Sequence, residues 1–372
     1  VQKGLAAGLV EKVPGAELFV EYMDAKRQPP ETTFPLLYEL YRLKYKDRRP
    51  AVLVASDDAA VDFLVAYREK LFPGVPVLTC GVGVLTAERV GGQGGYTGVT
   101  EKTDISGTIE VALRLMPGLR TVAAVADGTE TGKWHMERFR LAMRAYAGRL
   151  EAREIAGQSF AATAGQLSTL TPDTAVLYLG LLRDPEGRVF TVAESMAFVA
   201  RSTPQPVFAV WDFLVGRGAV GGVVVSGERQ GRVLADMAAS LLAGTRVGDI
   251  PFQALQPTAG VFDYKSLIRH GLSPTALPPG AVVINRPLSF VERHKAALLV
   301  TGGVLLGMVL GLVLLLLYIE RRRRAERERS ESRKRFQDFV ETMSVGVLEL
   351  DVAGRIVFAN AASHAICGLA PG

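Results

Sequence analysis

The sequence predicts an α/β protein with two similar lobes, each built on a parallel sheet, followed by one membrane-crossing helix and a short α+β segment. Three observations predict this organisation. Apolar runs of strand length alternate with amphipathic stretches of helix length over the first 295 residues. An uncharged apolar run, residues 296–319, then interrupts the alternation. Two more strand-like runs follow before residue 372.

The expected strands of the first region are rich in Val, Leu and Ala without polar alternation, as is typical of parallel strands buried on both faces. They are residues 17–22, 51–55, 75–79, 121–126, 174–179 and 206–211. The expected helices are residues 32–45, 58–70, 104–115, 133–146 and 191–201. Repeated βα units imply parallel sheets with right-handed crossovers. Because the pattern restarts near Pro117 and is too long for one five-stranded sheet, we expect two lobes.

Composition and charge exclude several classes of protein. Apolar residues make up 48% of the chain, which excludes a disordered protein, and Cys80 and Cys367 are its only cysteines, which excludes a disulfide scaffold. The net charge of +5 suggests nucleic-acid binding, but residues 320–335 carry nine basic and four acidic residues. The rest of the chain is therefore neutral, and we expect no nucleic-acid partner.

Residues 296–319 are 24 residues without a charge. As a helix they extend roughly 36 Å, enough to cross a hydrocarbon core of about 30 Å. The run Arg321–Arg324 on one side, against Arg293 and Lys295 on the other, places residues 320–372 in the cytoplasm and 1–295 in the periplasm or outside the cell. This orientation predicts a protein of the inner (cytoplasmic) membrane and excludes a bond between Cys80 and Cys367.

Gly303, Gly307 and Gly311 share one face of this helix. Such a face allows close helix–helix approach, so we expect a homodimer, although glycine is also common in membrane helices generally. The sequence begins at Val1 without a targeting segment, which an exported domain needs, and stops within an unfinished element. We therefore expect a fragment of a longer chain.

Ligands of open parallel α/β sheets bind beyond the carboxyl ends of the strands. The candidate ligand-binding residues at those ends are Asp57, Asp58, Cys80, Gly81, Asp127, Thr129, Tyr178, Leu179, Trp211 and Asp212. Helix N-termini there suit a carboxylate, and Asp57 or Asp127 suits an ammonium group, so an amino-acid-like zwitterion could use both. The alternatives are that Asp57 or Asp58 only caps a helix, and that Tyr178 and Trp211 are core aromatics.

No catalytic pattern is present. The four histidines are scattered without metal-ligand spacing, neither cysteine has a histidine partner in sequence, and GxSxG is absent. Residues 128–132 lack the spacing of a phosphate-binding loop. We expect no enzyme active site, metal or cofactor in the first region.

Several stretches resemble a known family. They are VEYMDAKRQPPETTF (20–34), VLVASDDAAVDFL (52–64), LFPGVPVLTCGV (71–82), GVTEKTDISGTIEVALRLMPG (98–118), WDFLVGRGAVGG (211–222) and FDYKSLIRHGLSPTALPPGAVVINRP (262–287). They resemble the ABC-transporter substrate-binding-protein-like sensor domains of bacterial histidine kinases and diguanylate cyclases. The resemblance covers nearly all of residues 1–294 and implies a type I periplasmic-binding-protein fold, with two Rossmann-like lobes around a hinge and ligand between them. It also implies that the first strand of lobe one precedes Val1.

Residues 336–372 resemble the start of a PAS domain, an α+β fold of which about 37 residues are present and whose ligand is unknown. The residues concerned are Gly346–Leu348, Asp351, Gly354–Ile356 and Phe358–Ala361. Residues 344–350 and 355–358 predict two strands joined by a tight turn at Ala353-Gly354, and Asn360 predicts a helix start.

The predicted organisation is a sensor domain (1–294, first strand missing), a transmembrane helix (296–319), a charged juxtamembrane helix or linker (320–335) and the N-terminal part of a PAS domain (336–372). We expect a signal-transduction receptor whose lobes close on a small solute. Closure would act through the exit at residues 278–287, the membrane helix and the PAS domain on a cytoplasmic output domain and its response partner. The first expectation for that output is a histidine kinase, with a diguanylate cyclase as the alternative. Two other readings stay open: a membrane-tethered solute-binding protein of an ABC transporter, and a domain that recognises a partner protein.

Overall fold

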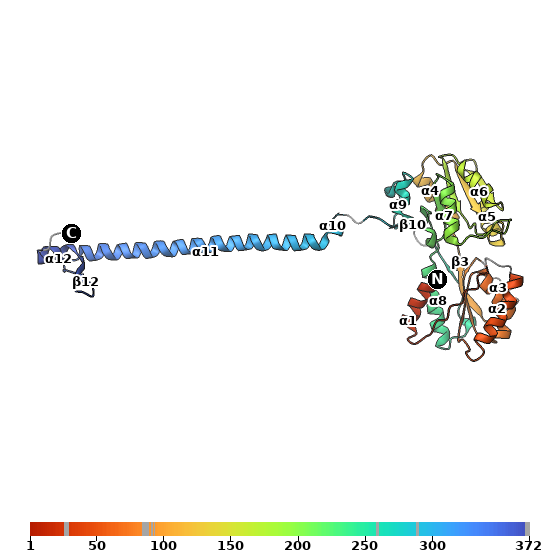
Figure 1. The fold of residues 1–372 in the computed structure, drawn as a ribbon, viewed down its shortest axis with the longest axis horizontal. Helices are drawn as coiled ribbons and strands as arrows, with labels where there is room; N and C mark the ends of the chain where they lie inside the picture. The colour runs from red at the N-terminus through yellow and green to blue at the C-terminus, as the bar shows by residue number, and fades with distance from the viewer. Residues whose placement is uncertain are drawn as a thin grey trace. The chain divides into compact units, whose positions relative to one another are not determined.

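The computed structural model describes residues 1–25, 30–83, 89–90, 92, 94–257, 260–287 and 290–368. They form two compact units, Val1–Arg286 and Pro287–Gly372, which are coloured from red to cyan and from cyan to blue in Figure 1. The first unit contains two separate sheets, and each sheet is the centre of one lobe. We call them lobe 1 and lobe 2.

Lobe 1 is a parallel four-stranded sheet in the order β1-β2-β3-β9. The strands are β1 (Leu53–Ser56), β2 (Val77–Val82), β3 (Tyr96–Glu101) and β9 (Gln253–Leu255). Helices α1 (Gln2–Lys12) and α8 (Gly227–Leu242) cover one face, and α2 (Pro30–Lys44) and α3 (Asp58–Leu71) cover the other. Alternate residues of β1 and β2 enter the two cores, which is why these two strands are mostly apolar.

Lobe 2 has a seven-stranded sheet in the order β11-β10-β8-β7-β6-β4-β5, in which only the β8–β10 pair is antiparallel. The strands are β4 (Thr121–Ala126), β5 (Glu151–Ala156), β6 (Thr174–Tyr178), β7 (Val207–Ala209), β8 (Gly221–Gly222), β10 (Val261–Asp263) and β11 (Val282–Ile284). Helices α4 (Ile105–Leu115), α5 (Glu130–Met143) and α9 (Tyr264–Arg269) cover one face. Helices α6 (Phe160–Ser168) and α7 (Val192–Ser202) cover the other.

The chain passes between the lobes three times, after β3, after β8 and after β9. Three connections between two α/β lobes form a hinge, so the two-lobed α/β fold expected from the sequence is confirmed. Short 3₁₀ turns complete the unit at Arg144–Tyr146, Asp212–Leu214, Val247–Asp249 and Pro274–Ala276.

Most of the predicted elements are present, and strand 121–126 has the predicted bounds. The prediction of a strand at residues 17–22 is wrong, because the structure has no regular element there. Within the described residues no strand pairs with this segment, and an extended chain becomes a strand only when a neighbour accepts its hydrogen bonds. The elements that the sequence did not indicate include β3, β5, α6 and α8.

The second unit begins with α10 (Phe290–Arg293) and a single 48-residue helix, α11 (Lys295–Thr342). Helix α11 includes both the apolar run 296–319 and the charged run 320–335. Within the described residues it is the one helix that is long and apolar enough to cross a membrane. Ion pairs one turn apart, Arg324 with Glu320 and Arg322 with Glu326, stabilise its charged half.

After α11, an antiparallel hairpin of β12 (Leu348–Leu350) and β13 (Ile356–Ala359) precedes α12 (Ala361–Cys367). Gly354 has φ of +79°, as the predicted tight turn requires. Asn360 caps α12, and its amide group donates to the carbonyls of Val340 and Val345, which ties the hairpin to the end of α11. Residues 369–372 of the predicted PAS segment lie outside the described residues.

Candidate functional site

The carboxyl ends of the strands of the two lobes face each other. Glu101, the last residue of β3 in lobe 1, accepts a hydrogen bond of 2.6 Å from the indole N–H of Trp211, which follows β7 in lobe 2. Gly83, just after β2, contacts the ring of Trp134 on α5. These two contacts define the region that we call the interlobe site.

Glu101 is the central acidic group of the interlobe site. Burial raises the pKa of its carboxyl, and the nearby carboxylates of Asp57 and Asp58 raise it further. Hydrogen bonds from Trp211 and Gln230 act in the opposite direction because they stabilise the ionised form. A positively charged group placed among these carboxylates would be attracted by all three and would favour ionisation of Glu101.

Three aromatic rings form the lobe 2 wall of the site. His135 packs edge-on between Trp134 and Trp211, with ring centroids 4.8 Å and 5.0 Å away, and the guanidinium of Arg138 lies over the Trp134 ring. Burial, helped by Arg138, lowers the pKa of His135 to about 4, so the imidazole is neutral at pH 7. Its Nδ1 atom is buried without a hydrogen-bond partner. The wall is therefore aromatic, with its rings packed edge to face, and its central imidazole is uncharged.

Trp134 also brings the lobes into contact. A Cβ built on Gly83 would lie 2.9 Å from the Trp134 ring, closer than Cβ atoms approach other heavy atoms. Glycine at this position allows the indole of lobe 2 to reach the backbone of lobe 1. Any side chain here would have to push the lobes or the ring apart.

On the lobe 1 side, Asp57 caps α3 and accepts the N–H of Asp58 at 2.7 Å. Its φ of +82° is rare for a residue with a side chain, and strain of this kind collects at functional sites. Asp58 pairs with Arg89 at 2.6 Å. Gly81 donates its N–H to Gln230 at 3.2 Å, which connects the end of β2 to α8.

Four other predicted residues form hydrogen bonds or pack inside lobe 2. Asp127 is buried, and its carboxylate accepts from the backbone N–H groups of Thr129 and Leu182 at 3.0 and 2.9 Å. Thr129 caps α5. The Tyr178 hydroxyl bonds Ser195 at 2.8 Å inside the core, in agreement with the core alternative for this aromatic, and Leu179 is fully buried.

The last two predicted residues are Cys80, in the core of lobe 1, and Asp212, in a turn of lobe 2. Cys80 is fully buried in the lobe 1 core, where burial raises the pKa of its thiol to about 11 and makes the thiolate a minor species. Asp212 begins a 3₁₀ turn beside Trp211, and its N–H donates to the carbonyl of Val225. The structure thus brings Asp57, Asp58, Gly81 and Trp211 to the interlobe site. The other predicted residues make their contacts within a single lobe.

Sequence reasoning missed Glu101, Gln230, Trp134 and His135. Glu101 closes a strand, β3, that the alternation did not reveal, so its carboxyl end was not considered. Gln230 lies in the first turn of α8, a helix that was not predicted either. Trp134 and His135 lie five and six residues after the Thr129 cap, in the second turn of α5, and their position near a helix start is the sequence signal that points to them.

Within the described part of the chain, no group of three or more His, Cys, Asp or Glu side chains is arranged to hold a metal ion. The interlobe site combines neighbouring carboxylates with an aromatic wall. Such a surface binds a cation or ammonium group beside an apolar or aromatic body.

Comparison with known proteins agrees with the fold. The ABC domain in complex with L-Trp from Streptococcus pneumonia is 17% identical, with a TM-score of 0.58, and the match covers 76% of this chain and 94% of that one. A conserved domain protein from Vibrio cholerae is 18% identical, with a TM-score of 0.56 over 75% and 92% of the two chains. A ligand-free, open substrate binding protein with adhesive properties from Clostridium difficile is 16% identical, with a TM-score of 0.53 over 77% and 94%.

No curated protein matches the chain. A protein family does: residues 39–273, more than half of the chain, match the family described as ABC transporter substrate binding protein. This match includes most of both lobes and all the residues named at the interlobe site. The first unit has the two-lobed fold of periplasmic binding proteins, and the chain belongs to the ABC transporter substrate binding protein family.

Proposed function

We propose that the first unit is an extracytoplasmic domain that binds a small solute between its lobes and transmits its closure across the membrane. The observation that carries the proposal is the hydrogen bond between Glu101 of lobe 1 and Trp211 of lobe 2. It joins the lobes at the carboxyl ends of their strands, where ligands of α/β sheets bind. A solute that contacts both groups would favour the closed arrangement by its differential affinity for it.

The proposed solute carries an ammonium group beside a flat apolar body, as an amino acid does. Asp57 and Glu101 supply the negative charge, since Asp58 is paired with Arg89, and the rings of Trp134 and Trp211 supply the aromatic surface. The L-Trp complex of the Streptococcus pneumonia domain, which shares the fold, supports a ligand of this kind. No cofactor is part of the proposal.

The signalling part of the proposal depends on the second unit. Residues 296–319 of α11 would cross the inner membrane, with Gly303, Gly307 and Gly311 facing a second copy in a homodimer. The arginine-rich half of α11 would lie at the cytoplasmic surface. The hairpin and helix at residues 348–367 would begin a PAS domain that leads to an output domain. A histidine kinase is our first expectation for that output domain, and a diguanylate cyclase is the alternative.

A second candidate is a membrane-tethered protein that delivers its solute to an ABC permease, and the family match itself favours it. The hairpin after α11 favours the sensor, because a delivery protein needs no structured domain beyond its anchor. Exposure of the hairpin to a protease added on the cytoplasmic side, changed by solute, would support signalling. Solute uptake that depends on the chain would support delivery.

The experiment for binding uses the full chain in lipid nanodiscs and the twenty amino acids as the panel. Isothermal calorimetry measures affinity, and tryptophan fluorescence reports the site directly, since Trp134 and Trp211 are the only two tryptophans. We expect at least one amino acid to bind. Glu101→Gln should then weaken its binding by tenfold or more, because a charge-assisted hydrogen bond is worth roughly 1.5–3 kcal/mol.

The control is Glu110→Gln, an exposed glutamate on α4 away from the site, which should bind as the parent does. Because the pKa of Glu101 is raised, its ionised fraction falls as the pH is lowered through that pKa, and affinity for an ammonium ligand should fall with it. Failure of every amino acid to bind, or equal binding by Glu101→Gln, would contradict the proposal.

A further inference from the structure

Two segments connect the interlobe site to the point where the chain leaves lobe 2. The first is residues 211–219, which begin at Trp211 and which we call the Trp211 turn. The second is residues 284–286, the last of the first unit, which we call the exit. The two segments are far apart in sequence, but Gly216 of the turn lies against Asn285 of the exit.

The Trp211 turn is tightly packed. A bridge between Val215 and Ala219 closes it. A Cβ built on Gly218 would lie 2.9 Å from the Cβ of Ala200 on α7, so the turn also packs closely on this helix. Close-packed segments have low compressibility and transmit displacements instead of absorbing them. A displacement of Trp211 is therefore carried along the turn.

Gly216 is the point of contact between the turn and the exit. Its φ is +80°, and a Cβ built on it would lie 3.0 Å from the side-chain amide nitrogen of Asn285 and 3.4 Å from the side chain of Ile284. Glycine allows the backbone of the Trp211 turn to approach the exit this closely. A side chain at this position would press on Asn285.

Asn285 is held by a buried carboxylate. Its amide group donates a hydrogen bond of 2.7 Å to Asp263, the last residue of β10, which is 4% exposed. We call this bond the exit clamp. The other carboxylate oxygen of Asp263 accepts from the N–H and the hydroxyl of Ser266 at 2.9 and 2.5 Å and caps α9. Burial would raise the pKa of this carboxyl, but hydrogen bonds from Ser266 and Asn285 outweigh it and keep the pKa below its ordinary value.

The backbone of Asn285 needs the support of the clamp. Its φ is +55°, in the left-handed region that residues with a side chain rarely occupy. Asparagine tolerates this region better than most residues, so its strain is comparable to one hydrogen bond to a carboxylate. Strain of this kind persists only where the surroundings hold it. Without the clamp, Asn285 can return to the extended region, which changes the direction of the chain at residue 286.

We propose that the exit clamp is a switch controlled from the interlobe site, with Gly216 as the part that moves against it. The inference rests on the proposed binding of a solute at Trp211. A solute ammonium that competes for Glu101 releases the indole of Trp211, and the freed turn shifts toward the exit. Gly216 then displaces the amide of Asn285 from Asp263, the clamp opens and the chain leaves lobe 2 in a new direction.

A bond with a purely structural role would stabilise β11 whatever happens at Trp211. β11 is the edge strand of the lobe 2 sheet and pairs with β10 over three residues, so the protection of its N–H groups is sensitive to the clamp. A switch makes this protection depend on Trp211. The two roles therefore differ in one measurable quantity, the amide hydrogen exchange of β11 after a change at Trp211.

The test measures amide hydrogen exchange of the full chain in nanodiscs, on peptides that contain residues 282–286, first without added solute. It compares the parent, Trp211→Phe, Asn285→Asp and the double variant. Trp211→Phe keeps an aromatic ring and removes the N–H that bonds Glu101. Asn285→Asp keeps the size of the side chain and replaces the donor of the clamp by a second carboxylate facing Asp263.

We expect each single variant to speed exchange at residues 282–286 by about threefold or more, because an open clamp raises the population of locally unfolded β11. The double variant should exchange no faster than Asn285→Asp, since both changes act through one bond. Peptides from β4 should not change in any variant, which shows that lobe 2 stays folded.

A third variant opens the clamp from the turn itself. Gly216→Ala places a methyl group against the amide of Asn285 and should speed exchange at residues 282–286 as Asn285→Asp does. The matched control is Gly271→Ala. It has a similar left-handed φ, +67°, but among the described residues its Cβ would meet nothing within 4 Å, so it should exchange as the parent does.

Unchanged exchange at residues 282–286 in Trp211→Phe would overturn the proposal, whatever the amino-acid panel shows. A double variant in which the two single effects multiply would also overturn it, because the clamp would then be independent of the interlobe site. So would an amino acid that binds the parent without speeding exchange at residues 282–286. Failure of every amino acid to bind contradicts the proposed function instead, so the two can fail separately.

Discussion

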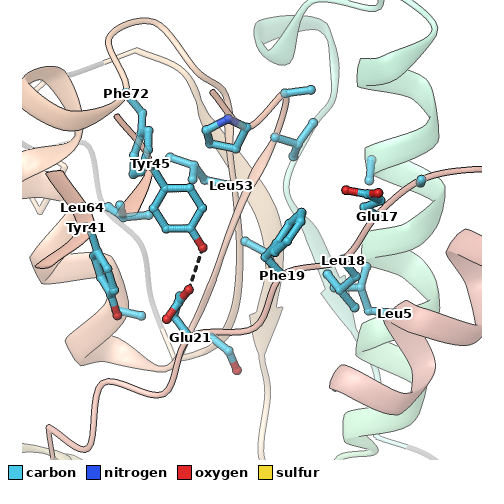
Figure 2. Close-up of a pocket in the computed structure, with 18 of the residues that line it drawn as sticks. Leu5, Glu17, Leu18, Phe19, Glu21, Tyr41, Tyr45, Leu53, Leu64 and Phe72 are labelled. Carbon is cyan, nitrogen blue, oxygen red and sulfur yellow. Dashed lines mark hydrogen bonds between the residues drawn. The ribbon is translucent and has the colours of Figure 1, made fainter. Parts of the chain in front are cut away.

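The two lobes share a plan but differ in how completely their sheets are paired. In lobe 2 the strand β4 lies between β5 and β6, and the apolar residues of β4 and β6 are buried on both faces. In lobe 1 the comparable strand β1 ends the sheet, and a cavity of about 870 Å³ lies beside it (Figure 2). The apolar segment 17–22 of lobe 1 has no strand neighbour within the described residues and forms no strand, so an apolar run becomes a strand only where a neighbour accepts its hydrogen bonds.

The largest expected effect on stability is in lobe 2. Phe208 of β7 is 1% exposed and packs in the lobe 2 core. Phe208→Ala should lower the free energy of unfolding by about 3–5 kcal/mol, because it removes a buried ring and leaves a cavity. Urea unfolding of the full chain in detergent, followed by circular dichroism, measures the change. A loss below 1 kcal/mol would contradict the description of a tightly packed lobe 2.

A second effect tests the aromatic wall of lobe 2 through pH. The pKa of His135 is about 4 in the fold and near 6.5 when unfolded, so the unfolded chain binds more protons between these values. Stability should therefore be fully present above pH 6.5 and fall as the pH is lowered toward 4, by about 3 kcal/mol in all. Unfolding followed by the fluorescence of Trp134 and Trp211 at several pH values measures it.

His135→Phe is the matched variant for this prediction, because it keeps an aromatic ring between the two tryptophans and removes the titrating group. It should flatten the loss of stability between pH 6.5 and pH 4. If the variant loses as much stability as the parent over that range, protonation of His135 is not the cause.

The smallest effect belongs to lobe 1 and completes the comparison with Phe208. Phe19 is 50% exposed and lines the cavity beside β1. Phe19→Ala should change the free energy of unfolding by less than about 0.5 kcal/mol, as expected for an exposed position. The same urea unfolding measures this change, and a loss of more than about 1 kcal/mol would contradict the half-exposed position of Phe19.

Much of the fold could be predicted from the sequence. Runs such as 121–126 are apolar at every position because both faces of the strand are buried, and this pattern is visible without a structure. The absence of a strand at 17–22 could not be predicted, because whether a segment finds a strand neighbour depends on which segments meet in space. Strand β8 was missed for another reason: it consists of Gly221 and Gly222, which carry no side-chain pattern.

The location of the site could be predicted from the sequence, but only some of its residues could. The rule that ligands bind at the carboxyl ends of strands led to Asp57, Gly81 and Trp211, which the structure brings to the interlobe site. The same rule included Asp127 and Tyr178, whose polar atoms are used by their own lobe. Sequence spacing cannot tell whether a carboxylate at a strand end meets backbone N–H groups or the other lobe, as the contrast between Asp127 and Glu101 shows.

We propose above all that a solute binds where the two lobes meet. The most direct measurement is amide hydrogen exchange of the full chain in nanodiscs, with and without a millimolar mixture of the twenty amino acids. We predict slower exchange in peptides that contain residues 81–83, 127–135 and 211–212, with residues 53–56 unchanged. No change at these interlobe peptides, or slowing confined to residues 53–56, would contradict it.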